Sequence, residues 1–112
     1  MGRKDKGIKR MDKKKALKIA RRYAETVSRH YPVSKIILFG SYADDTNRKD
    51  SDIDLAIVLE SVEDVFDTQV ELMQLRTDED LLIEPHPFTL EDFNSSNPFV
   101  SEILKNGIEI KN

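Results

Sequence analysis

Three aspartates, Asp50, Asp52 and Asp54, occupy alternate positions at the start of an apolar run, IDLAIVL. The β-branched residues of this run predict a buried strand over residues 53–59. Side chains alternate between the two faces of a strand, so the carboxylates of Asp52 and Asp54 are expected on one side, close together. At an effective dielectric of roughly 20, two such charges ~4 Å apart repel by about 4 kcal/mol. This crowding predicts a cation between them, and Mg²⁺ is the ion that combines carboxylate with phosphate oxygens.

Two other interpretations apply to this cluster. The first is an EF-hand loop, which also begins D-x-D-x-D; it fails because Leu55 and Ser61 occupy the positions of the required glycine and glutamate. The second is a pair of solvated aspartates that caps the strand, and the aspartates alone leave it open.

A glycine and a serine, Gly40 and Ser41, follow another β-rich run, SKIILF over 34–39. The glycine permits a tight turn and close backbone approach, and a helical turn over 41–45 would direct backbone N–H groups toward an anion. No Gly-Lys-Ser/Thr follows, so this is not a Walker A loop. Ten residues separate Ser41 from the aspartate pair, which would place a metal beside this phosphate cradle.

Glu84 supplies a third carboxylate near the end of a predicted strand over 81–88, although an exposed glutamate at a sheet edge is the alternative. Three carboxylates can hold two Mg²⁺ ions, which is the common arrangement for in-line displacement at phosphorus. His86 lies beside Glu84 and is expected to be a structural or surface residue.

The remaining elements follow from hydrophobic spacing and breakers. Asp12 is a candidate N-cap for an amphipathic helix that ends before Pro32, and Gly107 is expected to end the last helix in a left-handed conformation. Pro85 and Pro87 confine the third strand to its end or to a sheet edge. Four phenylalanines are expected in the core: Phe39, Phe66, Phe88 and Phe99. The predicted helices span 12–31, 64–77 and 98–106, a short turn of helix is considered over 89–93, and a last extended piece covers 108–110. We therefore expect an α/β (α+β) two-layer fold, with a small mixed β-sheet packed against helices.

The composition is that of one domain. The chain has 112 residues, 38% of them hydrophobic, and no cysteine, which suits a cytoplasmic protein. We assign residues 1–11 to a basic disordered leader and residues 12–112 to the domain. Residues 1–30 carry 12 Lys/Arg against 3 Asp/Glu, whereas the rest carries 6 against 18. The basic run is interpreted as a solvated tail and helix face, and neither a membrane nor direct nucleic-acid binding is expected.

The segment GSYADDTNRKDSDID, from Gly40 to Asp54 and preceded by the strand IILF, resembles the small nucleotidyltransferases of the DNA polymerase beta superfamily. The resemblance covers nearly all of residues 12–110 and implies the nucleotidyltransferase (polymerase beta-like) fold. It implies that Gly40 and Ser41 bind a nucleoside triphosphate, that Asp52 and Asp54 hold Mg²⁺, and that Glu84 is the third ligand and a base for the attacking hydroxyl.

Small proteins of this kind resemble antitoxins whose partner is a helical HEPN-type toxin. The resemblance implies transfer of AMP from ATP to a toxin hydroxyl, expected to be a tyrosine. The alternative is a catalytically weak binding module that neutralises the toxin by complex formation. Two departures from the family pattern bear on this choice: Asp45 stands at or near a position that is often glycine, and Glu84 replaces the more usual aspartate.

Overall fold

A computed structural model describes residues 12–48 and 51–111, so the expected leader, Lys49 and Asp50 lie outside the described residues. Its elements are, in chain order, α1(Lys13–His30), β1(Val33–Phe39), α2(Ser41–Asp44), β2(Ile53–Leu59), α3(Val65–Gln74), η2(Asp78–Asp80), β3(Ile83–Thr89), α4(Pro98–Asn106) and β4(Ile108–Glu109). None of the described helices has the length and apolar character that a bilayer crossing requires.

The four strands form one mixed sheet in the order β3-β2-β1-β4. Strand β1 pairs antiparallel with both β2 and β4, and β2 pairs parallel with β3. The position of β3 at an edge confirms the expectation from its prolines, because Pro85 and Pro87 lack the N–H that an inner strand would need. The mixed sheet packed against helices confirms the predicted fold class.

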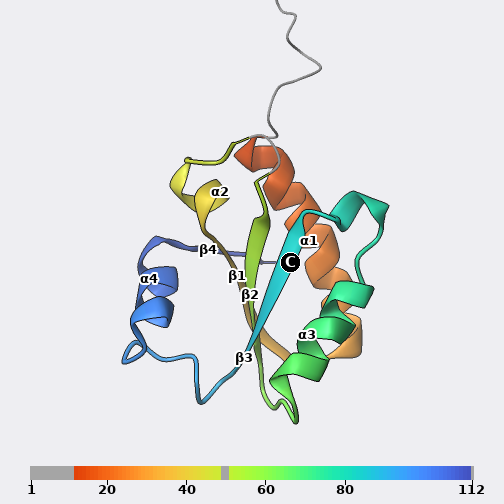
Figure 1. Ribbon diagram of the computed structural model, residues 1–112, viewed down its shortest axis with the longest axis vertical. Coiled ribbons are helices and arrows are strands. Elements are labelled where there is room, and N and C mark those ends of the chain that lie inside the picture. Colours follow the sequence, from red (N-terminus) through yellow and green to blue (C-terminus); the bar gives the residue numbers. More distant parts are fainter. Residues whose placement is uncertain (1–11, 49–50, 112) are drawn as a thin grey trace, which may run out of the picture.

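Helices lie on both faces of the sheet (Figure 1). Helices α1 and α3 cover the larger core, in which alternate β2 residues from Ile53 to Leu59 are fully buried. Helix α4 packs on the opposite face, where Ile103 meets Ile37 and Ala56. The alternation along β2 therefore sends Asp52, Asp54 and Ala56 toward the face that α4 covers.

Helix α1 begins and ends as expected, after Asp12 and before Pro32, whereas the cap predicted for the end of α4 is wrong. Asp12 caps α1 by accepting the Lys15 N–H at 2.9 Å, as expected. Gly107 follows α4 with φ −77° and ψ 166°, so the expected left-handed cap is wrong. Packing explains this glycine instead, since a Cβ there would lie 2.5 Å from the Ile103 carbonyl oxygen and 2.5 Å from the Ile37 Cγ2. The residues considered for a further turn of helix, 89–93, include no helical residue.

The expectation for the phenylalanines is half right. Phe39 and Phe88 pack beside the smaller core, but Phe66 is 80% exposed and Phe99 is 49% exposed. Helical spacing predicted α3 correctly but could not show which of its apolar residues face the sheet. Phe66 lies on the outer surface of α3, together with Val70 and Met73.

Candidate active site

The sheet register brings Asp54 and Glu84 together. Asp54 is the partner of Glu84 in the parallel β2–β3 ladder and of Phe39 in the antiparallel β1–β2 ladder. Parallel partners lie on neighbouring strands about 4.8 Å apart, with their side chains on the same face. The two carboxylates therefore meet at the end of the sheet where β1 finishes and β2 and β3 begin.

Gly40 stands against this pair, at the turn between β1 and α2. Its φ of 78° and ψ of −152° belong to a region that only glycine adopts readily. A Cβ at this position would lie 2.6 Å from the Asp54 Oδ2. The glycine thus satisfies both the turn and the space that the Asp54 carboxylate occupies, and it brings Ser41, the first residue of α2, to the same end of the sheet.

Asp52 completes a group of three carboxylates. Burial raises the pKa of the Glu84 carboxyl; His86 opposes this effect, whereas the charges of Asp54 and Asp52 and a hydrogen bond with Asp52 add to it. Asp52 itself is exposed, just ahead of β2. The negative charges at this site therefore disfavour ionisation of Glu84 in the protein without a cation.

His86, which the sequence analysis set aside as a structural or surface residue, is a further candidate for the site. Its Nε2 lies 3.2 Å from the Asp54 Oδ1, and both side chains are about one quarter exposed, at 27% and 23%. The expectation of a purely structural or surface residue overlooked the strand period: His86 is two residues after Glu84, so both side chains point to the same face. The Phe39 ring supports the imidazole, with ring centroids 5.2 Å apart.

Asp45 occupies the left-handed conformation, with φ 62°, at the end of α2. Glycine adopts this conformation without strain, which gives a physical reason for the glycine often found at or near this position in the resembling family. The Asp45 charge is matched by Lys13, whose Nζ lies 3.1 Å from the Asp45 Oδ2. Nothing in the sequence spacing links Lys13 to Asp45, because their contact depends on how α1 packs beside α2.

The donor set fits a divalent cation. Asp54, Glu84 and His86 each offer one ligand atom, and these atoms lie within 4.8 Å of one another. Carboxylate oxygens are the ligands that Mg²⁺ prefers, and a cation would offset the charges of Asp54 and Asp52, which add to the effect of burial on the Glu84 pKa. Arg48 lies in the loop ahead of this group, where its backbone N–H donates to the Ser51 hydroxyl at 2.6 Å.

Comparisons with known proteins identify the family and similar folds. Residues 22–112 match the family described as Polymerase beta, Nucleotidyltransferase. A search of curated proteins gives no significant match. Among solved structures, a putative nucleotidyltransferase from Sulfolobus solfataricus is 19% identical with a TM-score of 0.65, and the alignment covers 87% of this chain and 80% of that one.

Two further similar structures are toxin–antitoxin structures. One contains AMP-PNP, with 22% identity and a TM-score of 0.57, and the other is a mutant of MntA-HpeT, with 20% identity and a TM-score of 0.55. Each alignment covers 90% of this chain and 73% of the other. At these identities the structural likeness establishes the shared fold, and the family match covers most of the sequence. The chain belongs to the polymerase beta nucleotidyltransferase family.

Proposed function

We propose that the protein is an Mg²⁺-dependent nucleotidyltransferase that transfers AMP from ATP to a hydroxyl of a partner HEPN-type toxin and thereby acts as its antitoxin. The observation that carries this proposal is the pairing of Asp54 with Glu84 beside Gly40, at the residues that the family pattern uses. The toxin–antitoxin structure with AMP-PNP and the MntA-HpeT mutant support the choice of nucleotide and partner. The cytoplasmic location stays a prediction from the sequence.

Asp52, Asp54 and Glu84 would hold two Mg²⁺ ions, which supply charge neutralisation and Lewis-acid polarisation of the phosphates. His86 hydrogen-bonds Asp54 and fixes the orientation of that carboxylate. Gly40 and Ser41 would bind the triphosphate, because the glycine lets the backbone approach closely and the serine offers a hydroxyl.

In the transfer, a hydroxyl oxygen of the partner attacks the α-phosphorus of ATP. A bond forms between that oxygen and the phosphorus, the bond from the α-phosphorus to its bridging oxygen breaks, and pyrophosphate leaves. Glu84 accepts the proton of the attacking hydroxyl. The chain contributes mainly by positioning the two reactants and by stabilising charge that develops at the phosphate.

The acceptor would be supplied by the partner, and a tyrosine is the proposed residue. This choice follows from the resemblance to antitoxins, and the two similar toxin–antitoxin structures support a protein partner. In this proposal the nucleotidyltransferase domain binds the nucleotide, and the toxin supplies the attacking hydroxyl.

The experiment that tests this proposal mixes the protein, Mg²⁺, the partner and ATP labelled at the α-phosphate. Label should reach the partner, and ATP labelled at the γ-phosphate should leave it unlabelled. Asp52→Asn with Asp54→Asn should abolish labelling, whereas Glu91→Gln with Asp92→Asn, which removes two exposed carboxylates from a distant turn, should not. Labelling of the partner by γ-labelled ATP alone would refute AMP transfer.

The second candidate is a binding module that silences the toxin by complex formation. The two departures from the family pattern, Asp45 and Glu84, are the reason to test it, since each changes the charge or reach of the site. In that case the Asp52→Asn and Asp54→Asn double variant should still neutralise the toxin. Loss of neutralisation with the complex intact would reject this candidate.

A further inference from the structure

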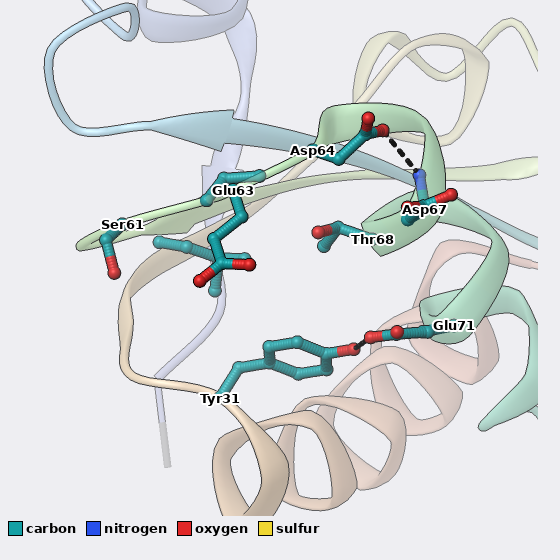
Figure 2. A pocket seen from close by; sticks show the side chains of 9 residues that line it. Tyr31, Ser61, Glu63, Asp64, Asp67, Thr68 and Glu71 are labelled. Atoms are coloured by element: carbon teal, nitrogen blue, oxygen red, sulfur yellow. Dashed lines mark hydrogen bonds between the residues drawn. The ribbon is translucent and has the colours of Figure 1, made fainter.

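A polar cavity lies at the Leu59 end of β2, opposite the end that carries the carboxylate group of the candidate active site. Its volume is about 290 Å³, and it is enclosed by Tyr31, by the turn after β2 and by the first turns of α3. Leu59, at its edge, is five residues along β2 from Asp54, which places the cavity roughly 16 Å along the strand from the carboxylate group. We call it the α3 pocket, defined by Tyr31, Glu63, Asp67, Thr68 and Glu71 (Figure 2).

The α3 pocket is negatively charged, and no lysine, arginine or histidine is among the residues that line it. Within the described part of the chain, the carboxylates of Glu63 and Asp67 make no ion pair and no hydrogen bond. The Glu71 carboxylate accepts a hydrogen bond from the Tyr31 hydroxyl, which leaves its charge without a cation. The pocket is therefore lined by four carboxylates, of which Asp64 accepts the Asp67 N–H as the cap of α3, and none of its lining residues is positively charged.

Thr68 gives an independent indication that the pocket takes a ligand. It is 8% exposed, and its hydroxyl has no hydrogen-bond partner among residues 12–48 and 51–111. Figure 2 shows this hydroxyl and the Glu63 carboxylate turned toward the same space beside the Tyr31 ring. Because buried polar groups in folded proteins are nearly always hydrogen-bonded, an unpaired hydroxyl aimed into a cavity favours a donor that comes from outside.

The outer surface of α3 carries an apolar stripe next to the pocket. Phe66, Val70 and Met73 lie at steps of four and three residues, and they are 80%, 53% and 38% exposed. Residues at these steps share one face of a helix, and Asp67 and Glu71 follow Phe66 and Val70 by one position, on the neighbouring face. Helix α3 thus presents apolar contact area beside a row of unbalanced negative charge.

We propose that the α3 pocket binds an arginine side chain of a partner protein, whose neighbouring apolar residues pack on the stripe of Phe66, Val70 and Met73. Charge complementarity selects a basic partner, and the form of the pocket selects arginine. A guanidinium has five N–H donors in a plane and stacks on aromatic rings, which matches carboxylates and a free hydroxyl grouped around the Tyr31 ring. This binding does not depend on nucleotide transfer, since the α3 pocket shares no residue with the carboxylate group at the other end of β2.

The test is a titration of the full chain, followed by the NMR signals of its backbone amides, with Nα-acetylarginine amide as the probe. Saturable shifts are expected at residues 63–71. Nα-acetylcitrulline amide has the same shape without the charge and should cause no saturable shift. Nα-acetyllysine amide should bind more weakly than the arginine probe, and equal or tighter binding of either control would overturn the assignment to arginine.

Variants separate the pocket from the fold and from the active site. Glu63→Gln with Asp67→Asn should lower the affinity for the arginine probe roughly tenfold, on the scale of two partly exposed ion pairs. Thr68→Val keeps the side-chain shape and should also weaken binding, while Asp52→Asn with Asp54→Asn should leave it unchanged.

A separate binding measurement, with a helical peptide, tests the apolar stripe of Phe66, Val70 and Met73. Phe66→Ser should weaken binding of an amphipathic helical peptide that carries one arginine, and it should leave binding of the arginine probe unchanged. Unaltered affinity in both Thr68→Val and the Glu63→Gln, Asp67→Asn variant would overturn the proposal.

Discussion

Gly40→Ala is the substitution that best tests the link between the backbone turn and the candidate active site. Alanine at φ 78° and ψ −152° enters a region that costs about 1–3 kcal/mol for a residue with a Cβ. The new Cβ would also lie 2.6 Å from the Asp54 Oδ2, so the carboxylate must move. We expect the free energy of unfolding of the variant to be about 2 kcal/mol lower, which lowers Tm by roughly 8–16 °C for a domain of this size.

Gly107→Ala is the matched control for this change. Its Cβ would meet the Ile103 carbonyl oxygen and the Ile37 Cγ2 at 2.5 Å each, a packing conflict that also costs roughly 1–3 kcal/mol. The atoms nearest to this Cβ belong to Ile103, Ile37 and Leu38, so the two variants should lose similar stability by different routes.

The assay is thermal unfolding with and without Mg²⁺ and a non-hydrolysable ATP analogue. A ligand present at 100 times its Kd stabilises the folded state by about 2.7 kcal/mol. Gly107→Ala should retain the ligand-induced rise in Tm that the unaltered chain shows, whereas Gly40→Ala should lose it because Asp54 is displaced. An equal ligand-induced rise in both variants would refute the argument that Gly40 makes room for Asp54.

Three further predictions follow from charge and backbone conformation. Without Mg²⁺, Glu84→Gln should be more stable than the unaltered chain at pH 7. The pKa of the Glu84 carboxyl is raised in the folded state, so the stability that this group contributes is present at low pH and is lost as pH rises through that pKa. Denaturant unfolding in EDTA should therefore show the difference between the two proteins vanish toward pH 4. Burial and the Glu71 hydrogen bond raise the Tyr31 pKa to about 12, so the unaltered chain should lose stability between pH 10 and about 12. Tyr31→Phe should lose less stability over this range, as followed by circular dichroism. Equal losses in the two proteins would contradict a raised Tyr31 pKa. Asp45→Gly should unfold at the same or a higher temperature than the unaltered chain. Glycine removes the strain of the left-handed backbone, worth up to about 1 kcal/mol, which offsets the loss of the exposed ion pair with Lys13. A clear fall in Tm would show that the ion pair contributes more than the strain costs.

The sequence predicts most of the fold because its local signals agree with one another. The Asp12 cap, the apolar strand from Ile53 to Leu59 and the prolines of β3 each favour one structure, and each occurs as expected. The error at Gly107 has a physical cause: a glycine after a helix commonly provides a left-handed cap, but here it relieves a contact between α4 and β1 that depends on tertiary packing.

The candidate site was only partly predictable for the same reason. The period of two along β3 could have joined His86 to Glu84 from the sequence alone. The contact between Lys13 and Asp45 could not be inferred, because it joins the start of α1 to the end of α2 across 32 residues. The exposure of Phe66 was equally hidden, since helical spacing shows which residues share a face but not which face meets the sheet.

The two departures from the family pattern are accommodated by neighbouring residues in this structure. Asp45 places a negative charge near the expected triphosphate, but Lys13 pairs with it at 3.1 Å and reduces its effect on an incoming phosphate. Glu84 is one methylene longer than aspartate, and the parallel register sets it beside Asp54, while its carboxyl also hydrogen-bonds Asp52. When these carboxylates are ionised and no cation is bound, their repulsion costs stability. The arrangement therefore favours a bound cation, which the proposed enzyme requires and the proposed binding module does not.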